Sequence, residues 1–379
     1  MNPAYEVNVL DGLRNVGVNV DETLAEVYET WCNDPANKKE EIIYTSDRFF
    51  PEMPLDEEMV KGISKIVVCA CGTAYHAGLV GKLVIEKMAK IPVDVEIASE
   101  YRYSHPLTTE GTLAIVVSQS GETIDTLAAL KEAKRLGAQS LAVTNSIGSS
   151  IAREADYTIY TLAGPEIAVA STKAYTTQLV ALLLLALYMG QVKGTVSQEE
   201  AARILRALNE LPKHIEKVLE SRDLMADFAD KLKEAEDIFY LGRSIDYAIA
   251  MEGALKLKEI SYIHAEAYAG GELKHGTLAL ITPKTPVIAV VTQNEIAAKM
   301  YSNIQEVRAR GAEVIGIGYD DDTEIEKYTT SVVRIPRVDE FIAPILSVIP
   351  MQLLAYYTGI KRGNDVDKPR NLAKSVTVE

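Results

Sequence analysis

The strongest constraint on the fold is a pattern of strands and helices that occurs twice along the chain. In the first half, short apolar runs appear as SKIVVCAC (64–71), VDVEIAS (93–99), TLAIVVSQS (112–120), SLAVTN (140–145) and YTIYTL (157–162), and helical patterns lie at about 75–90 and 123–136. The first, third, fourth and fifth of these runs have counterparts in the second half, in the same order: DIFYLGRS (237–244), VIAVVTQN (287–294), EVIGIGYD (313–320) and SVVRIP (331–336). The apolar helix at 177–190 likewise corresponds to the one at 351–363. All offsets lie between 172 and 174 residues. Alternating apolar strands and amphipathic helices indicate parallel sheets covered on both faces, so we predict an α/β fold with two doubly wound halves related by internal duplication.

This repeat also divides the chain. We expect an N-terminal arm over 1–60 with one helix near 21–32, a first sheet domain over 61–195 and a helical connector over 196–235. A second sheet domain over 236–360 and a C-terminal tail over 361–379 complete the expected organisation. A chain of 379 residues is long enough for two such domains.

Composition excludes several classes of function. The formal net charge of −15 argues against a nucleic-acid partner, because such recognition depends on basic patches. The longest apolar run, LVALLLLALYMG (179–190), is shorter than the roughly 18 residues that argue for a membrane span, so we expect a buried helix and no membrane association. The opening residues are neither basic nor strongly apolar, which predicts no export and a cytoplasmic location.

Metal and nucleotide motifs are absent from the sequence. The five histidines show no H-E-x-x-H spacing, and Cys69 and Cys71 are too close for a C-x-x-C pair, so we predict no metal. Neither G-x-G-x-x-G nor G-x-x-x-x-G-K-[ST] follows the first strand, which disfavours dinucleotides and nucleoside triphosphates.

Two hydroxyl-rich loops follow strands of the first half. SQSGET (118–123) offers the hydroxyls of Ser118, Ser120 and Thr123, with Gly121 permitting close backbone approach, and CGT (71–73) repeats the arrangement. Strand ends of this kind are where open α/β sheets bind ligands, and free N–H groups there suit a phosphate. The competing interpretation is ordinary helix N-capping. The equivalent loop of the second half, VTQNEIAAK (291–299), has no glycine and one hydroxyl, so we expect one phosphate-like site per chain.

The densest group of polar residues spans 251–276. On a helix, Glu252, Lys256, Glu259 and Ile263 would share one face, and such a ladder is typical of solvated ion pairs. Glycines then place His275 in a loop, where it could serve as an acid or base only if the fold or a partner subunit brings it to the carboxylate. By composition, the tail DVDKPRNLAKSVTVE (365–379) reads as a solvated end.

Five segments carry a resemblance to a known family. ACGTAYHAG, SQSGETIDTL, EIAVASTKAYTTQL, EGALKLKEISYIHAEAYAGGELKHG and DVDKPRNLAKSVTVE closely resemble the sugar-isomerase (SIS) half of the glucosamine-6-phosphate synthase family, over about residues 63–379. The resemblance implies two SIS subdomains, fructose 6-phosphate as substrate, no metal or organic cofactor, a homodimer and a tail that closes the active site. The expected reaction is ketose–aldose isomerisation, with amination to glucosamine 6-phosphate when ammonia is supplied.

Roles for individual residues come from the same resemblance. Glu259 would move a proton between carbons 1 and 2, His275 of the neighbouring subunit would open the sugar ring, and Lys374 would form a Schiff base with the ketose. Lys256 and Arg370 would support these groups. The substrate and its phosphate would contact Thr73, Ser118, Gln119, Ser120, Thr123, Val169 and Ser171.

Two departures from the family keep alternatives open. Ala74 stands where the family often has a serine, and the chain begins Met1-Asn2-Pro3 where the family has a glutaminase domain with an N-terminal cysteine. We therefore expect no glutamine hydrolysis from this chain alone. The alternatives are a stand-alone SIS enzyme, such as a sugar-phosphate deglycase or deaminase-isomerase, and a non-catalytic module that binds a sugar phosphate.

Overall fold

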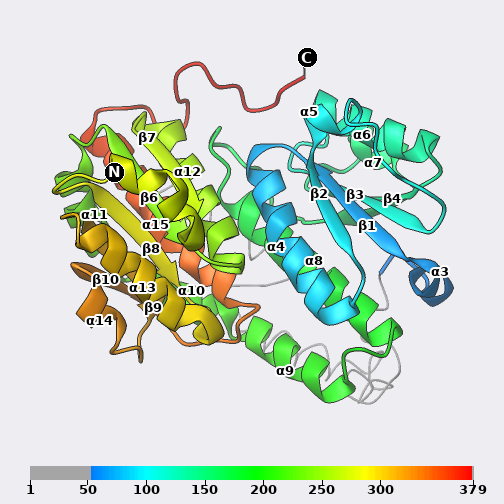
Figure 1. Ribbon diagram of the computed structural model, residues 1–379. Coiled ribbons are helices and arrows are strands. Elements are labelled where there is room, and N and C mark those ends of the chain that lie inside the picture. The colour runs from blue at the N-terminus through cyan, green and yellow to red at the C-terminus, as the bar shows by residue number, and fades with distance from the viewer. Residues whose placement is uncertain (1–52, 378–379) are drawn as a thin grey trace, which may run out of the picture. The chain divides into compact units, whose positions relative to one another are not determined.

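The computed structural model describes residues 53–377 and contains two compact units (Figure 1). Within the described range, the first unit comprises residues up to Glu166, Ser171–Pro212 and the chain from Ser375 onward, and the second comprises Ile167–Ala170 and Lys213–Lys374. The helix expected near 21–32, and most of the N-terminal arm, lie outside the described residues.

A parallel five-stranded sheet forms the centre of the first unit. Its strands are β1 (Lys65–Ala70), β2 (Val93–Ile97), β3 (Thr112–Ser118), β4 (Gln139–Thr144) and β5 (Tyr157–Tyr160), in the order β2-β1-β3-β4-β5. Its helices are α3 (Glu57–Gly62), α4 (Gly72–Ala89), α5 (Ala98–Tyr101), α6 (Ile124–Arg135), α7 (Ser150–Glu154), α8 (Lys173–Val192) and α9 (Gln198–Asn209). Helices α4 and α8 pack together (Figure 1). The buried side chains of α5, α6 and α7 form a separate cluster on β1, β3 and β4.

The second unit repeats this architecture. Its strands are β6 (Asp237–Gly242), β7 (His264–Ala269), β8 (Pro286–Val291), β9 (Glu313–Tyr319) and β10 (Ser331–Ile335), in the order β10-β9-β8-β6-β7. Its helices are α11 (Arg222–Leu232), α12 (Ile245–Ser261), α13 (Ala297–Arg308), α14 (Ile325–Tyr328) and α15 (Ala343–Lys361), and its 3₁₀ helices are η1 (Gly270–His275), η2 (Thr277–Leu280) and η3 (Asn294–Ile296). Helix α10 (Leu211–Leu219) carries the chain from the first unit into the second.

Both sheets have the same connectivity when β6 is matched with β1, β7 with β2 and β8 with β3. All strand pairs are parallel, and α12 and α15 pack together in the second unit as α4 and α8 do in the first. The predicted α/β class with two duplicated, doubly wound halves is therefore confirmed.

The repeat extends to the backbone before each first helix. Gly72, just after β1, has φ +54°, and Ser244, just after β6, has φ +53°. These positions are 172 residues apart, the offset that also relates β1 to β6. Because a left-handed conformation favours glycine, Ser244 adopts a strained backbone that the turn into α12 imposes.

Two helices among the described residues are long and apolar enough to cross a membrane, but both are core helices. In the most apolar window of α8, 78% is buried, and in that of α15 the share is 89%. The expectation that the run at 179–190 is a buried helix is confirmed.

One expectation about α12 is wrong. The helix ends at Ser261, and Tyr262 adopts a left-handed conformation with φ +62°. Ile263 therefore lies outside the helix and cannot share the face of Glu252, Lys256 and Glu259. The following residues form the edge strand β7, whose alternation of alanine with larger residues did not stand out from the helical pattern before it.

Candidate active site

The hydroxyl loop at the end of β3 is held together by its own side chains. Ser118 is buried, and its Oγ lies 3.1 Å from Thr123 Oγ1. The amide of Gly121 donates to the same Ser118 Oγ at 3.1 Å. Thr123 precedes α6 without a side-chain capping bond to it, so the N-capping interpretation is wrong for this residue.

Gly121 is required at the centre of this loop. Its φ is +65°, and a Cβ there would lie 2.0 Å from Ser149 Oγ. Ser149 caps α7, and the Gly121 carbonyl accepts from the Ile151 amide at 3.0 Å. The neighbouring Glu122 accepts from the Ser150 amide at 2.8 Å, and its hydrogen bonds with Ser150 lower the pKa of Glu122 below its ordinary value. The start of α7 thus fixes the loop from the side.

Two residues of the tail belong to this site. Ser375 Oγ lies 3.1 Å from Ser120 Oγ, and the carbonyl of Val376 accepts from the Ile124 amide at the start of α6 at 3.2 Å. The expectation of a solvated end, drawn from composition alone, is therefore wrong for Ser375, which is partly buried, whereas Val376 makes its backbone contact with its side chain exposed. Gln119 contributes its carbonyl, which accepts from the Asn145 amide at 3.2 Å.

The second hydroxyl loop of this unit leads from β1 into α4. Gly72 makes the left-handed step, and Thr73 follows it in the first turn of α4, partly buried. Ala74, the next residue, is buried at 9% exposure and carries no hydroxyl. Ser171 is partly buried and lies just before Thr172, the N-cap residue of α8.

The second unit buries a triad of charges on α12. Lys256 Nζ lies 3.4 Å from Glu252 Oε1 and 2.6 Å from Glu259 Oε2. The side chains of Lys256 and Glu252 are fully buried, whereas that of Glu259 is 19% exposed. Burial acts to lower the pKa of Lys256, but the two carboxylates outweigh it and raise that pKa above its ordinary value. The interpretation of this ladder as solvated ion pairs is therefore wrong.

The tail also pairs with residues 167–170 in the second unit. Lys374 Nζ donates to the carbonyl of Ala168 at 2.5 Å, and the Val169 amide donates to the carbonyl of Asp367 at 3.0 Å. The guanidinium of Arg370 stacks over the ring of Tyr262 at 4.2 Å, and its backbone amide donates to the Tyr262 hydroxyl at 2.8 Å. The tail residues Asp367 and Lys374 are thus both bonded to the short stretch that contains Ala168 and Val169.

His275 occupies the last position of η1 and is exposed. Within the described part of the chain, no hydrogen bond or ion pair joins it to Glu259 or to Lys374. The structure therefore brings Lys256 and Glu259 together but leaves His275 apart from them.

Glu166 is a structural residue of this site that the sequence pattern did not predict. This carboxylate is buried at 6% exposure, and its Oε2 accepts from the amides of Thr172 and Ala174 at 3.2 and 2.9 Å. It thus caps α8 and closes the loop that carries Val169 and Ser171. The available signal was a carboxylate placed shortly before a helix start, where it complements free N–H groups.

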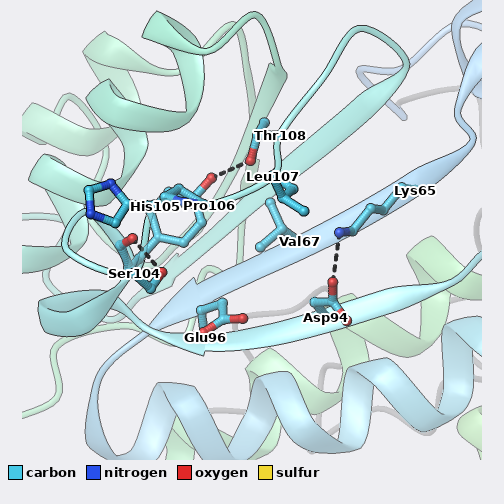
Figure 2. Close-up of a pocket in the computed structure, with 10 residues that line it drawn as sticks. Lys65, Val67, Asp94, Glu96, Ser104, His105, Pro106, Leu107 and Thr108 are labelled. Atoms are coloured by element: carbon cyan, nitrogen blue, oxygen red, sulfur yellow. Dashed lines mark hydrogen bonds and ion pairs between the residues drawn. The ribbon is translucent and has the colours of Figure 1, made fainter.

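A separate hollow in the first unit contains none of these residues (Figure 2). It has a volume of about 370 Å³, with Lys65 and Asp94 paired at 2.8 Å on one side and the Tyr101 hydroxyl bonded to Thr108 at 2.7 Å on the other. Lys65 and Asp94 lie near the starts of β1 and β2, away from the carboxyl ends where open sheets bind ligands. Among the described residues, no group of three or more His, Cys, Asp or Glu could hold a metal ion.

Comparison with known proteins accounts for the duplicated fold. The family model described as "SIS domain" matches residues 60–188 and again 231–362. The chain belongs to the SIS domain family. The two units are therefore SIS subdomains, and the two matches agree with the internal repeat.

Relatives with high identity narrow this assignment. The chain is 58% identical to the glutamine–fructose-6-phosphate aminotransferase (isomerizing) of Clostridium acetobutylicum over 328 residues, which are 86% of this chain and 54% of that protein. It is 55% identical to the corresponding enzyme of Clostridium tetani over 338 residues, 89% of this chain and 56% of that protein. The C-terminal domain of glucosamine-fructose-6-phosphate aminotransferase from Francisella tularensis superposes with a TM-score of 0.80 at 42% identity, covering 83% of this chain and 89% of that one.

The pair of SIS subdomains thus corresponds to the isomerase half of these enzymes. The chain spans about half the length of the curated relatives that it matches.

Proposed function

We propose that the chain isomerises fructose 6-phosphate and, when ammonia is supplied, aminates it to glucosamine 6-phosphate. The observation that carries this proposal is the carboxylate of Glu259, 19% exposed and 2.6 Å from the fully buried ammonium of Lys256. Ketose–aldose conversion transfers one proton from carbon 1 to carbon 2 through an enediol-like species, and a carboxylate that is part buried and part accessible suits that transfer. The names of the relatives support the choice of substrate.

The phosphate group would bind at the hydroxyl loop of the first SIS subdomain. Ser118, Ser120 and Thr123 offer hydroxyls there, Gln119 and Thr73 lie on the same loop and on the neighbouring one, and Gly121 holds the loop in place. Such a cradle can stabilise a phosphate by hydrogen bonding without a basic side chain, in a protein of net charge −15.

Lys374 would supply the amine that attacks the ketose carbonyl, releasing water and leaving an imine that withdraws electrons from carbon 1. Its ammonium is anchored on the Ala168 carbonyl, next to Val169, the predicted sugar contact. The stacking of Arg370 on Tyr262 holds the preceding part of the tail. We assign Lys374 as the covalent residue, Arg370 and Lys256 as supporting charges, and Val169 and Ser171 as sugar contacts.

His275 would open the sugar ring from a neighbouring subunit. His275 is exposed at the end of η1 and makes no hydrogen bond or ion pair with Glu259 of its own chain among the described residues, which suits a side chain that enters the active site of a second copy. The proposal therefore includes a homodimer, a glutaminase domain as the source of ammonia, and a cytoplasmic location where sugar phosphates are available.

Product analysis with matched variants tests this proposal. The chain is incubated with fructose 6-phosphate, with and without ammonium, and glucose 6-phosphate and glucosamine 6-phosphate are quantified. Glu259→Gln should lower kcat by about 10²–10⁴-fold, because it removes the proton-transfer group. Glu272→Gln, at an exposed glutamate of η1, is the control and should leave kcat unchanged.

Each alternative function has its own outcome in this experiment. Measurable binding of fructose 6-phosphate without turnover would reject catalysis and favour the non-catalytic module. Release of ammonia from glucosamine 6-phosphate, without synthesis, would favour a deaminase-isomerase. Equal numbers of His275→Ala and Glu259→Ala chains, mixed after separate purification, should recover part of the activity; no recovery would contradict the sharing of His275 between subunits.

A further inference from the structure

The second SIS subdomain contains a cluster of hydrogen-bond donors that already holds an anion. Thr292 and Gln293 are the first two residues after β8. The Thr292 amide donates to Asp246 Oδ2 at 2.7 Å, and the Thr292 hydroxyl donates to Asp246 Oδ1 at 2.5 Å. The backbone and side chain of Gln293 also interact with this carboxylate, which is buried at 2% exposure. A carboxylate of the chain itself therefore occupies the donors at this strand end.

This strand end corresponds to the hydroxyl loop of the first subdomain. Strand β8 takes the place in its sheet that β3 takes in the other, and α12 follows β6 as α4 follows β1. Gly72 and Ser244 have nearly the same positive φ, +54° and +53°, at the start of these two helices. We therefore align α4 with α12 by matching Gly72 with Ser244. With the same offset of 172 residues, Asp246 corresponds to Ala74. The first subdomain thus has a methyl group at the position where the second has a carboxylate.

We propose that Asp246 is a built-in ligand that fills the second subdomain's own oxyanion cradle, so that each chain has one cradle open to a phosphate and one closed by its own side chain. Carboxylate and phosphate oxygens accept the same charge-assisted hydrogen bonds from amides and hydroxyls, so one group can replace the other. The small side chain of Ala74 leaves the first cradle free. That the first cradle takes the phosphate of a sugar rests on the proposed function.

Removing the Asp246 carboxylate should therefore open a second site. The probe is inorganic phosphate, measured by equilibrium dialysis with labelled phosphate. The wild-type chain should bind one phosphate and Asp246→Ala should bind two. Asp246→Asn keeps the shape of the side chain and should still bind one. If Asp246→Ala folds, as judged by circular dichroism and a cooperative thermal transition, and still binds one phosphate, the proposal is overturned.

Thermal unfolding gives a second measurement of the same variant. Asp246→Ala leaves the donors of Thr292 and Gln293 without their acceptor, and a bound phosphate would restore it. The unfolding midpoint of Asp246→Ala should therefore rise with phosphate concentration by more than that of wild type, since a ligand that binds only the folded state stabilises it. Equal increases in the two proteins would contradict the proposal.

A reciprocal variant decides the question even if Asp246→Ala does not fold. Ala74→Asp should place a carboxylate on the donors of the first cradle and lower its affinity for phosphate by about 100-fold or more, because the two like charges would compete for the same donors. Binding equal to that of wild type would overturn the proposal. The proposed function has its own failure: the wild-type chain would not bind fructose 6-phosphate. Even then, Asp246→Ala should bind one more inorganic phosphate than the wild-type chain, so the two proposals can fail independently.

Discussion

Replacing Lys256 by methionine gives the most direct test of the buried triad on α12. Methionine keeps most of the length and apolar volume of the lysine side chain but removes its charge. The change leaves Glu252, which is fully buried, and Glu259, which is 19% exposed, without the ammonium that lies 3.4 and 2.6 Å from them. We expect the second subdomain to lose stability because the buried carboxylate of Glu252 then loses the ammonium that lies beside it.

The magnitude distinguishes a buried triad from a surface ladder. Removing one partner of a buried ion pair typically costs about 3–5 kcal/mol, whereas a solvent-exposed i,i+4 pair on a helix is worth about 0.3–0.5 kcal/mol. The zero exposure of Lys256 and Glu252 places this case in the first class. In Glu252→Gln/Lys256→Met, only the partly exposed Glu259 keeps its charge. The double variant should therefore recover about 2 kcal/mol or more of the loss in the single variant.

The assay must report on the second subdomain alone. Native-state hydrogen exchange with mass spectrometry does so, if peptides covering β6 and α12 are compared with peptides covering β3 of the first subdomain. Lys327→Met is the matched control in the same subdomain, because Lys327 pairs with Glu324 at 2.5 Å on the exposed surface of α14. We expect no change in the control beyond experimental error.

Two results would refute this reasoning. A loss in Lys256→Met no larger than that in Lys327→Met would mean that water or proton uptake neutralises the carboxylates without cost. A double variant less stable than the single one would mean that Glu252 stabilises the fold independently of Lys256.

Three further predictions use other parts of the molecule. Lys374→Ala should abolish trapping of fructose 6-phosphate by borohydride, since reduction of the imine attaches the sugar to that lysine. The control Lys368→Ala should still be labelled, and labelling of Lys374→Ala, measured by mass spectrometry, would assign the imine to another residue. Gly121→Ala should lower the free energy of unfolding, measured in urea, by more than Gly148→Ala does. Both glycines have positive φ, which costs an alanine about 1–2 kcal/mol, but only at Gly121 would the added Cβ lie 2.0 Å from a hydroxyl. Equal losses in the two variants would contradict the clash. Burial raises the pKa of Asp246 to about 6, above its unfolded value of about 3.9, so the folded state takes up a proton as the pH falls through 6. The wild-type chain should thus gain unfolding free energy relative to Asp246→Asn between about pH 6 and 4, by up to about 3 kcal/mol, and a difference independent of pH would contradict the assignment.

The sequence predicted the regular part of the fold because the signals are local. Parallel strands buried on both faces read as short apolar runs, and a duplicated pattern can be checked against its own copy. Strand β7 was missed because HAEAYA, at the edge of its sheet, follows α12 directly and lacks a continuous apolar run. The left-handed Tyr262 that separates the two elements has no glycine or proline to mark it.

The chemistry of the site was less accessible to local reasoning. The spacing of Glu252, Lys256 and Glu259 places them on one face, but only the packing of α12 against its sheet and α15 decides that Glu252 and Lys256 are buried. The anchoring of Lys374 on Ala168 links residues 206 positions apart, which no periodicity reveals. Here the family resemblance supplied the expectation, and the residue-level pattern did not.

The two copies of the fold share their topology but differ in the side chains at equivalent strand ends. The first subdomain keeps the glycine and hydroxyls of SQSGET and a methyl group at Ala74, so its strand end can hold an oxyanion. The second has a carboxylate, Asp246, at the equivalent position and carries the Lys256 and Glu259 pair further along the same helix. In the second copy, the Asp246 carboxylate occupies the Thr292 donors that an oxyanion would otherwise use. The same topology thus accommodates an open cradle in one copy and, in the other, a cradle closed by its own side chain.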